Sequence, residues 1–178
     1  IFTLAVRIPE WARNAQERIC SGSEEAKDCQ KAVKDGYLYV TRAWKQGDEL
    51  MISFDMPVRR IYANPKVRKD AGLVCLMRGP VVYAAEEMDN GKQLWNLALP
   101  CESEILAEEK NSPELGDYTA LTAEGVRYME AAGDREKQYE LYSEKRPAAH
   151  GQEITFIPYY LWGNRTPGEM RVWIQEKR

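Results

Sequence analysis

Cysteine and histidine are the side chains of this 178-residue chain that could most directly bind a metal or act as a nucleophile and base. The four cysteines, Cys20, Cys29, Cys75 and Cys101, are widely spaced, and His150 is the only histidine. A zinc site normally needs three or four such ligands, often in closely spaced pairs. A hydroxyl nucleophile likewise needs a base within reach. We therefore expect no metal or cofactor in this chain, and we interpret His150 as a surface residue.

The cysteines leave one question about the redox state open. Cys75 lies in the apolar run LVCLM, which indicates a small buried hydrophobic residue. Cys20 and Cys29 flank a polar stretch and could form a disulfide in an oxidising compartment. Four free thiols is the simpler interpretation, and the sequence does not decide between the two.

Pairs of carboxylates could in principle hydrolyse a glycosidic bond, which requires an acid and a base or nucleophile on either side of it. The closely spaced pairs are Glu86–Glu87, Glu102–Glu104 and Glu108–Glu109. Adjacent residues of a strand point to opposite faces, and a chain with 28 acidic residues forms such pairs by chance. We interpret the pairs as solvated surface and keep a self-sufficient carboxylate glycosidase as a minor alternative.

Aromatic residues gather near the C-terminus beside polar ones. Sugar rings stack on exposed aromatic planes, so this cluster could bind a carbohydrate, whereas packing in the core is the alternative. The candidate ligand-binding residues are Tyr159, Tyr160, Trp162, Asn164 and Arg165.

Charge and hydropathy exclude two classes of partner. The net charge of −3 and the isoelectric point of about 5.4 do not fit a nucleic-acid-binding protein. The longest apolar runs, residues 73–77 and 81–85, are far shorter than the roughly 20 residues of a membrane helix. One basic segment, residues 58–78, either docks another domain or forms a solvated strand edge.

The elements that must position these residues are predicted to be strands. Apolar residues alternate with polar ones over residues 2–8, 50–56 and 169–175, which is typical of half-buried strands. Residues 36–40, 73–77, 81–85 and 154–157 are further β-like runs. Asp35–Gly36 predicts a turn, and Gly47–Asp48 predicts a hairpin turn. Residues 102–117 are acidic and predict a loop or one or two helical turns. The fold class is therefore all-β, with little helix.

Several blocks of the sequence resemble one carbohydrate-active family. The long run MPVRRIYANPKVRKDAGLVCLMRGPVVYAAEEMDNG closely resembles the C-terminal region of glycoside hydrolase family 127, the β-L-arabinofuranosidase family. The blocks RIPEWA, GYLYVTRAWKQGDEL and PYYLWGNRTPGEMRVW complete the order. The resemblance covers most of the chain apart from roughly residues 101–150.

The resemblance implies an architecture with the chemistry elsewhere. Family members carry an (α/α)₆ barrel that holds a zinc ion, a cysteine nucleophile and a glutamate acid/base, followed by two β-sandwich domains. This chain resembles only the sandwiches, so no catalytic residue is carried over and the zinc is expected in the barrel. The bacterial parent would be a hydrolase of carbohydrate metabolism. Its compartment stays open between the cytoplasm and the periplasm or exterior.

Two domains and two functions follow as expectations. We expect a first sandwich over residues 1–64 and a second over residues 65–178, with the boundary near Asn64–Pro65. The chain begins with Ile at a late strand of the first sandwich, so we expect a piece of a longer protein with an incomplete first sandwich. Its exposed strand edge predicts a homodimer or partial disorder. The expected function is a non-catalytic accessory domain that packs on its own upstream barrel. The alternative is an autonomous module that binds a plant-type glycan through residues 159–165.

Overall fold

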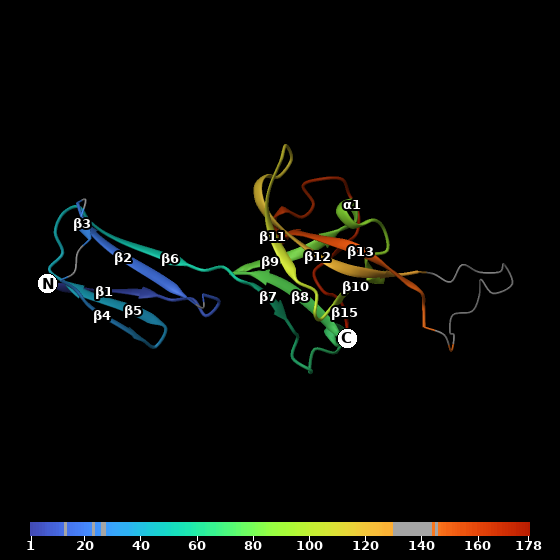
Figure 1. The fold of residues 1–178 in the computed structure, drawn as a ribbon, viewed down its shortest axis with the longest axis horizontal. Coiled ribbons are helices and arrows are strands. Elements are labelled where there is room, and N and C mark those ends of the chain that lie inside the picture. Colours follow the sequence, from blue (N-terminus) through green and yellow to red (C-terminus); the bar gives the residue numbers. More distant parts are fainter. Residues whose placement is uncertain (13, 23, 26–27, 130–143, 145) are drawn as a thin grey trace. The chain divides into compact units, whose positions relative to one another are not determined.

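The computed structural model describes residues 1–178 except 13, 23, 26–27, 130–143 and 145. It consists mostly of strands, with little helix, so the predicted all-β class is confirmed. The chain forms two compact units, Ile1–Pro57 (unit 1) and Val58–Arg178 (unit 2) (Figure 1). None of the helices in the described residues is both long and apolar enough to cross a membrane.

Unit 1 is a small sandwich of two three-stranded antiparallel sheets. One sheet has the order β1-β5-β4 and the other β3-β2-β6, and the two form separate layers (Figure 1). Ile19 from the second sheet packs with Leu38 and Val40 from the first, so the core lies between the layers. The strands are β1 Phe2–Arg7, β2 Ala15–Ser21, β3 Glu24–Glu25, β4 Gln30–Lys34, β5 Tyr37–Arg42 and β6 Asp48–Phe54.

The two predicted turns of unit 1 have different outcomes. Asp35 and Gly36 have φ angles of 53° and 76°, which is the pair of left-handed residues that a tight hairpin requires, and they join β4 to β5. A turn also forms at Gly47, whose φ is 88°. It is not a hairpin turn, because β5 pairs with β1 and β4 whereas β6 pairs with β2. The chain crosses from one sheet to the other there.

We expect unit 1 to unfold before unit 2. Among the described residues its core cluster has three buried apolar residues, against twelve in the main cluster of unit 2, and burial of a large aliphatic side chain stabilises by about 1.5–3 kcal/mol. Native-state hydrogen exchange should therefore show faster exchange for the amide of Val40 than for that of Leu121, in the core of unit 2. Equal protection of the two amides, together with a single unfolding transition, would contradict this order.

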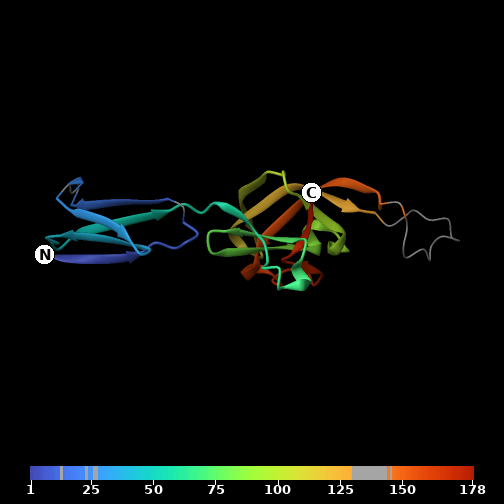
Figure 2. The ribbon, with the colours of Figure 1, turned by 90° about the horizontal axis from the view of Figure 1, so that it is seen from below.

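Unit 2 contains a closed ring of strands. Its sheet has the strand order β14-β9-β13-β12-β10-β15-β8-β7, and β8 also pairs with β9. The six strands β8, β9, β13, β12, β10 and β15 therefore form a closed, barrel-like ring instead of two separate layers (Figures 1 and 2). The strands are β7 Val58–Ile61, β8 Leu73–Arg78, β9 Val81–Glu86, β10 Leu97–Pro100, β11 Ile105–Ser112, β12 Gly116–Tyr128, β13 Ala149–Pro158, β14 Met170–Arg171 and β15 Ile174–Lys177. The described helices are α1 Glu87–Asn90 and the 3-10 turns η1 Arg68–Asp70, η2 Leu94–Asn96 and η4 Tyr159–Leu161.

The apolar runs of the middle of the chain line the inside of this ring. Residues 73–77 and 81–85 become β8 and β9, as the sequence predicts, and they are joined at Gly79, whose φ is 54°. Val74 and Leu76 of β8 are almost fully buried, as is Tyr83 of β9. The predicted strand over residues 169–175 is instead broken into β14, which pairs with β9, and β15, which pairs with β8 and β10.

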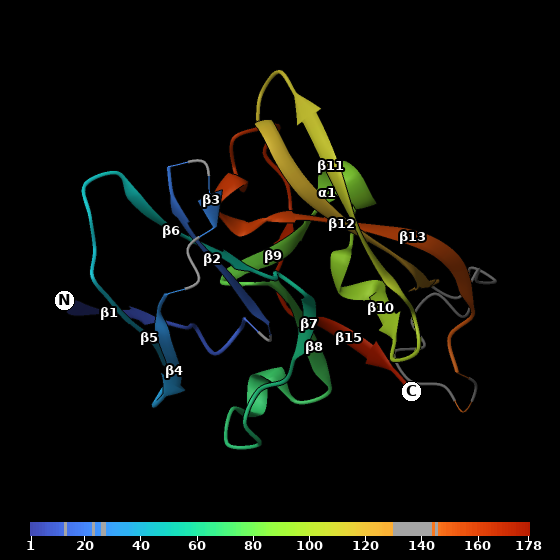
Figure 3. The same cartoon turned by 60° about the vertical axis from the view of Figure 1, so that its left-hand side comes forward.

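Two further differences concern the domain boundary and the acidic stretch. The units divide at Pro57–Val58 rather than near Asn64–Pro65, because β7 pairs with β8 and therefore belongs to unit 2. The prediction of a loop or helical turns over residues 102–117 is wrong. Half of this stretch is β11, which forms a long hairpin with β12 that projects from the ring (Figure 3).

Candidate functional site

The loop after β13 is held by an ion-pair network around Arg165. The Arg165 Nε donates to Glu86 Oε2 at 3.1 Å and Nη1 donates to Asp89 Oδ1 at 2.9 Å, while Nη2 bonds both carboxylates. These hydrogen bonds, with Asp89 first and Glu86 second, raise the pKa of Arg165 above its usual range. Glu86 ends β9 and Asp89 lies on α1, so Arg165 ties the loop to both elements.

The polar groups predicted to bind a ligand are used inside the protein. Asn164 Nδ2 donates to the carbonyl of Leu161 at 3.1 Å, and the Arg165 guanidinium is bound as above. Glu86 Oε1 also accepts the backbone N–H of Gly163 at 3.2 Å. Glu86 is only 7% exposed, so the interpretation of Glu86–Glu87 as a solvated pair is wrong for Glu86. Its partner lies 79 residues away, and no local sequence pattern reveals it.

The three predicted aromatic residues lie on the surface. Tyr159, Tyr160 and Trp162 are 44%, 66% and 45% exposed. The rings of Tyr159 and Trp162 stack with centroids 6.0 Å apart and an interplanar angle of 22°. A pocket of about 240 Å³ adjoins Trp162 and is also lined by Met88, Thr166 and Glu169. The sequence cluster is thus one surface feature, but its Asn and Arg members are bound to the protein itself.

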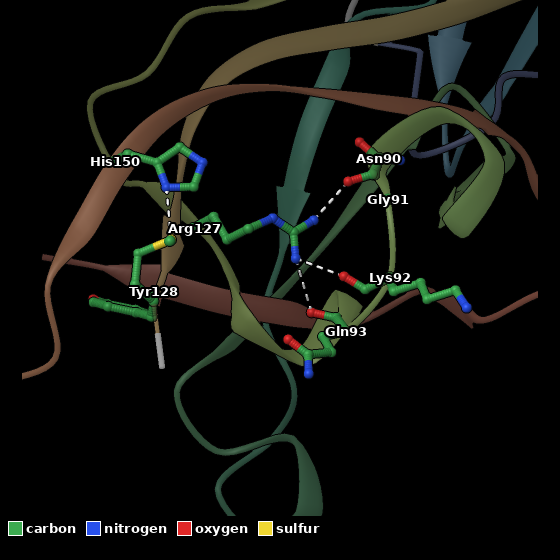
Figure 4. Close-up of a pocket in the computed structure, with 8 residues that line it drawn as sticks. Asn90, Gly91, Lys92, Gln93, Arg127, Tyr128 and His150 are labelled. Carbon is green, nitrogen blue, oxygen red and sulfur yellow. Dashed lines mark hydrogen bonds between the residues drawn. The ribbon is translucent and has the colours of Figure 1, made fainter. Parts of the chain in front are cut away.

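A second pocket, of about 420 Å³, surrounds Arg127. The guanidinium points at the loop after α1 and donates to the carbonyls of Asn90, Lys92 and Gln93 at 2.6–3.2 Å (Figure 4). Its Nε donates to Gln152 Oε1 at 2.7 Å. His150, which is exposed as predicted, has Nδ1 3.1 Å from the sulfur of Met129. Arg127 therefore holds this loop in place. No local sequence pattern indicates this role, because the partners of Arg127 are distant along the chain.

Two arginines of the basic segment, residues 58–78, are used inside the protein. Arg59 Nη2 donates to the carbonyl of Gly79 at 3.0 Å. Arg60 Nη2 donates to the carbonyls of Pro100 and Ser103 at 2.8 and 2.9 Å. These two arginines are half-buried and attach β7 to neighbouring turns, so neither predicted role describes them.

The described residues do not fit the zinc ion that the resemblance places in the barrel. Among them, no group of three or more His, Cys, Asp and Glu side chains could hold a metal ion. All four cysteines are free, Cys20 and Cys29 included. Cys101 is exposed and its thiol donates to Glu102 Oε2 at 3.2 Å.

Cys75 gives a pH-dependent prediction. Burial raises the pKa of its thiol to about 11. The reactive thiolate therefore forms only at a pH above the one at which an ordinary cysteine ionises. Its neutral form stabilises the fold fully below pH 9, and this stabilisation is lost as the pH rises towards 11. At pH 8.5 we expect iodoacetamide to modify exposed Cys101 in the native chain and Cys75 only after unfolding, as mass spectrometry would show. Equal modification of the two native thiols would contradict this assignment.

Family models match both units of the structure. The model described as "Glycoside hydrolase family 127 C-terminal domain" matches residues 58–175. The model described as "Beta-L-arabinofuranosidase, GH127 middle domain" matches residues 1–56. The division between the matches coincides with the division between units 1 and 2.

Comparisons with individual proteins point to the same family as the two family models. The chain is 33% identical to a non-reducing end β-L-arabinofuranosidase of Bifidobacterium longum subsp. longum, over 94% of this chain and 25% of that protein. A family 127 β-L-arabinofuranosidase structure from Geobacillus stearothermophilus T6 is 42% identical with a TM-score of 0.83, over 99% of this chain and 26% of that one. A solved glycoside hydrolase is 30% identical with a TM-score of 0.80, and 28% of its chain is covered. The chain therefore spans about a quarter of the length of these relatives, and it belongs to glycoside hydrolase family 127.

Proposed function

We propose that the chain is a non-catalytic accessory region of a β-L-arabinofuranosidase-type enzyme, and that it packs on and stabilises an (α/α)₆ catalytic barrel. The observation that carries the proposal is the match of unit 1 to the middle domain and of unit 2 to the C-terminal domain of the family. The barrel, its zinc ion and the sugar specificity of the whole enzyme belong to the proposal as well.

The internal bonding of unit 2 supports a scaffold role. Arg60, Arg127 and Arg165 each bridge separate segments through hydrogen bonds to carbonyls or carboxylates. Charged groups used in this way hold loops in one geometry and are not free to bind or transform a substrate. The geometry does not support the glycan-binding alternative, because the Asn164 amide and the Arg165 guanidinium already have protein partners.

The test compares activity and stability. The isolated chain should release no product from an aryl β-L-arabinofuranoside above the uncatalysed rate. Deleting the matched C-terminal quarter from the Geobacillus stearothermophilus relative should lower its Tm, and fusing this chain in its place should restore most of the loss. Hydrolysis by the isolated chain, or a fusion no more stable than the truncated enzyme, would contradict the proposal.

A second, smaller proposal concerns the open edge of strand β1 in unit 1. In the described residues β1 pairs with β5 alone, so its outer edge is open, and Phe2 at its start is 54% exposed. Open edges pair with other strands. We propose that the isolated chain dimerises through this edge and that Ala5→Lys, at an exposed position of β1, restores a monomer. Light scattering that shows a monomer at every concentration would rule this out.

A further inference from the structure

An exposed apolar surface lies on one side of unit 2. We call it the aromatic patch, and it consists of Met88, Tyr159, Tyr160 and Trp162, each at least 44% exposed. The members come from α1, from η4 and from the residue that follows η4. Met88 and Trp162 line the same small pocket, and Tyr159 stacks on Trp162, so these three side chains are continuous, and Tyr160 is the chain neighbour of Tyr159.

The backing of the patch is rigid. Arg165 joins the loop to Glu86 and Asp89, and Gly163 is anchored to Glu86 as well. Beyond the loop, the N–H of Glu169 donates to Glu87 Oε2 at 3.0 Å, and the Glu169 carboxylate accepts the N–H of Leu94 at 2.9 Å. A surface held in one geometry loses little entropy on association.

Close packing behind the patch strengthens this backing. A Cβ at Gly168 would lie 3.0 Å from Glu87 Cβ, so the loop and α1 approach each other as closely as a glycine allows. An aromatic side chain on such a support does not have to be ordered when a partner binds.

The composition of the patch fits a protein partner better than a sugar. Trp, Tyr and Met are enriched in the buried centres of protein interfaces, where they carry most of the binding energy. A sugar site also needs polar groups that fix the orientation of the ring. Here the side chains of Asn164, Arg165, Glu87 and Glu169 are already bonded within unit 2.

We propose that the aromatic patch is the surface on which unit 2 docks to the catalytic barrel. This inference rests on the proposed function and adds the contact surface to it. The matched relatives carry about three quarters of their length outside the region covered here, so in them a large neighbour is attached to this region. Covalent attachment gives that neighbour a high effective concentration, and a modest apolar patch is then sufficient for stable docking.

The experiment uses a chimera in which this chain replaces the region that it matches in the Geobacillus stearothermophilus enzyme. Hydroxyl-radical oxidation is measured at Trp162 in the chimera and in the isolated chain. Trp95 is the matched control, because it is 49% exposed and Trp162 is 45% exposed. We expect oxidation of Trp162 to be severalfold slower in the chimera and that of Trp95 to change little. Trp162→Ala should also lower the Tm of the chimera more than that of the isolated chain, whereas Trp95→Ala should lower the two by similar amounts.

Each other outcome has a defined meaning. A folded, stabilised chimera whose Trp162 oxidises as fast as in the isolated chain would overturn the docking surface and leave the proposed function intact. A chimera that does not fold, or is no more stable than the truncated enzyme, would count against the proposed function and the docking surface together. Self-association of the isolated chain, or saturable binding of an arabinose oligosaccharide, that is lost in Trp162→Ala would assign the patch to another occupant.

Discussion

Replacing Arg165 with alanine should lower the free energy of unfolding of unit 2 by about 3 kcal/mol. The substitution leaves the carboxylate of Glu86, whose side chain is 9% exposed, without its cation, and removing one member of a buried ion pair strands the other charge. The loop that carries Trp162 also loses its connection to Asp89. Chemical denaturation followed by a probe in unit 2 measures the effect.

Two comparisons separate this mechanism from a general loss of a surface charge. Arg68→Ala, at an exposed position, should change the stability by less than about 0.5 kcal/mol. Adding Glu86→Gln to Arg165→Ala should recover part of the loss, because the stranded charge is then removed. A loss below about 1 kcal/mol for Arg165→Ala, or no recovery in the double variant, would show that the network contributes little.

Local patterns predict about half of the strands and do not predict the pairing; β2, β4, β10 and β12 have no counterpart among the predicted runs. The alternating run at residues 2–8 and the apolar runs at 73–77 and 81–85 give β1, β8 and β9 because burial of one or both faces dictates the side-chain pattern. A turn forms at Gly47 as predicted, but the predicted hairpin does not, because a turn does not determine which strands pair. The ring of unit 2 closes through pairing of β15 with β8 and β10, which no local pattern encodes.

The acidic strand β11 shows a second limit. Within the described part of the chain it pairs only with β12, and it projects from the ring, so neither face is deeply buried; its residues carry no apolar alternation. Burial, the main signal for a strand, is therefore missing. The candidate site is also only partly predictable from the sequence. Composition singles out Trp162, but the role of Arg165 depends on Glu86 and Asp89, which lie far back along the chain.

Gly125→Ala should destabilise unit 2 by about 1–3 kcal/mol, because it overfills a packed core. Gly125 lies on β12 between β13 and β10. An added Cβ would lie 2.2 Å from Ile154 Cδ1 and 3.1 Å from the carbonyl oxygen of Ala98. Ile154 is fully buried in the main cluster, so its side chain can give way only by displacing closely packed neighbours. Thermal or chemical denaturation of unit 2 measures the loss.

The chain offers a matched control and a rescue for this prediction. Gly151 lies opposite Val126 on the adjacent strand β13, and a Cβ there meets nothing within 4 Å, so Gly151→Ala should leave the stability almost unchanged. Ile154→Ala removes both atoms that the new Cβ would strike, Cδ1 at 2.2 Å and Cγ1 at 2.6 Å, at a cost of about 2–5 kcal/mol on its own. If the clash is the cause, the double variant Gly125→Ala/Ile154→Ala is more stable than the sum of the two single effects predicts. Strict additivity, or an equal loss for Gly151→Ala, would mean that the cost at Gly125 has another origin than contact with Ile154.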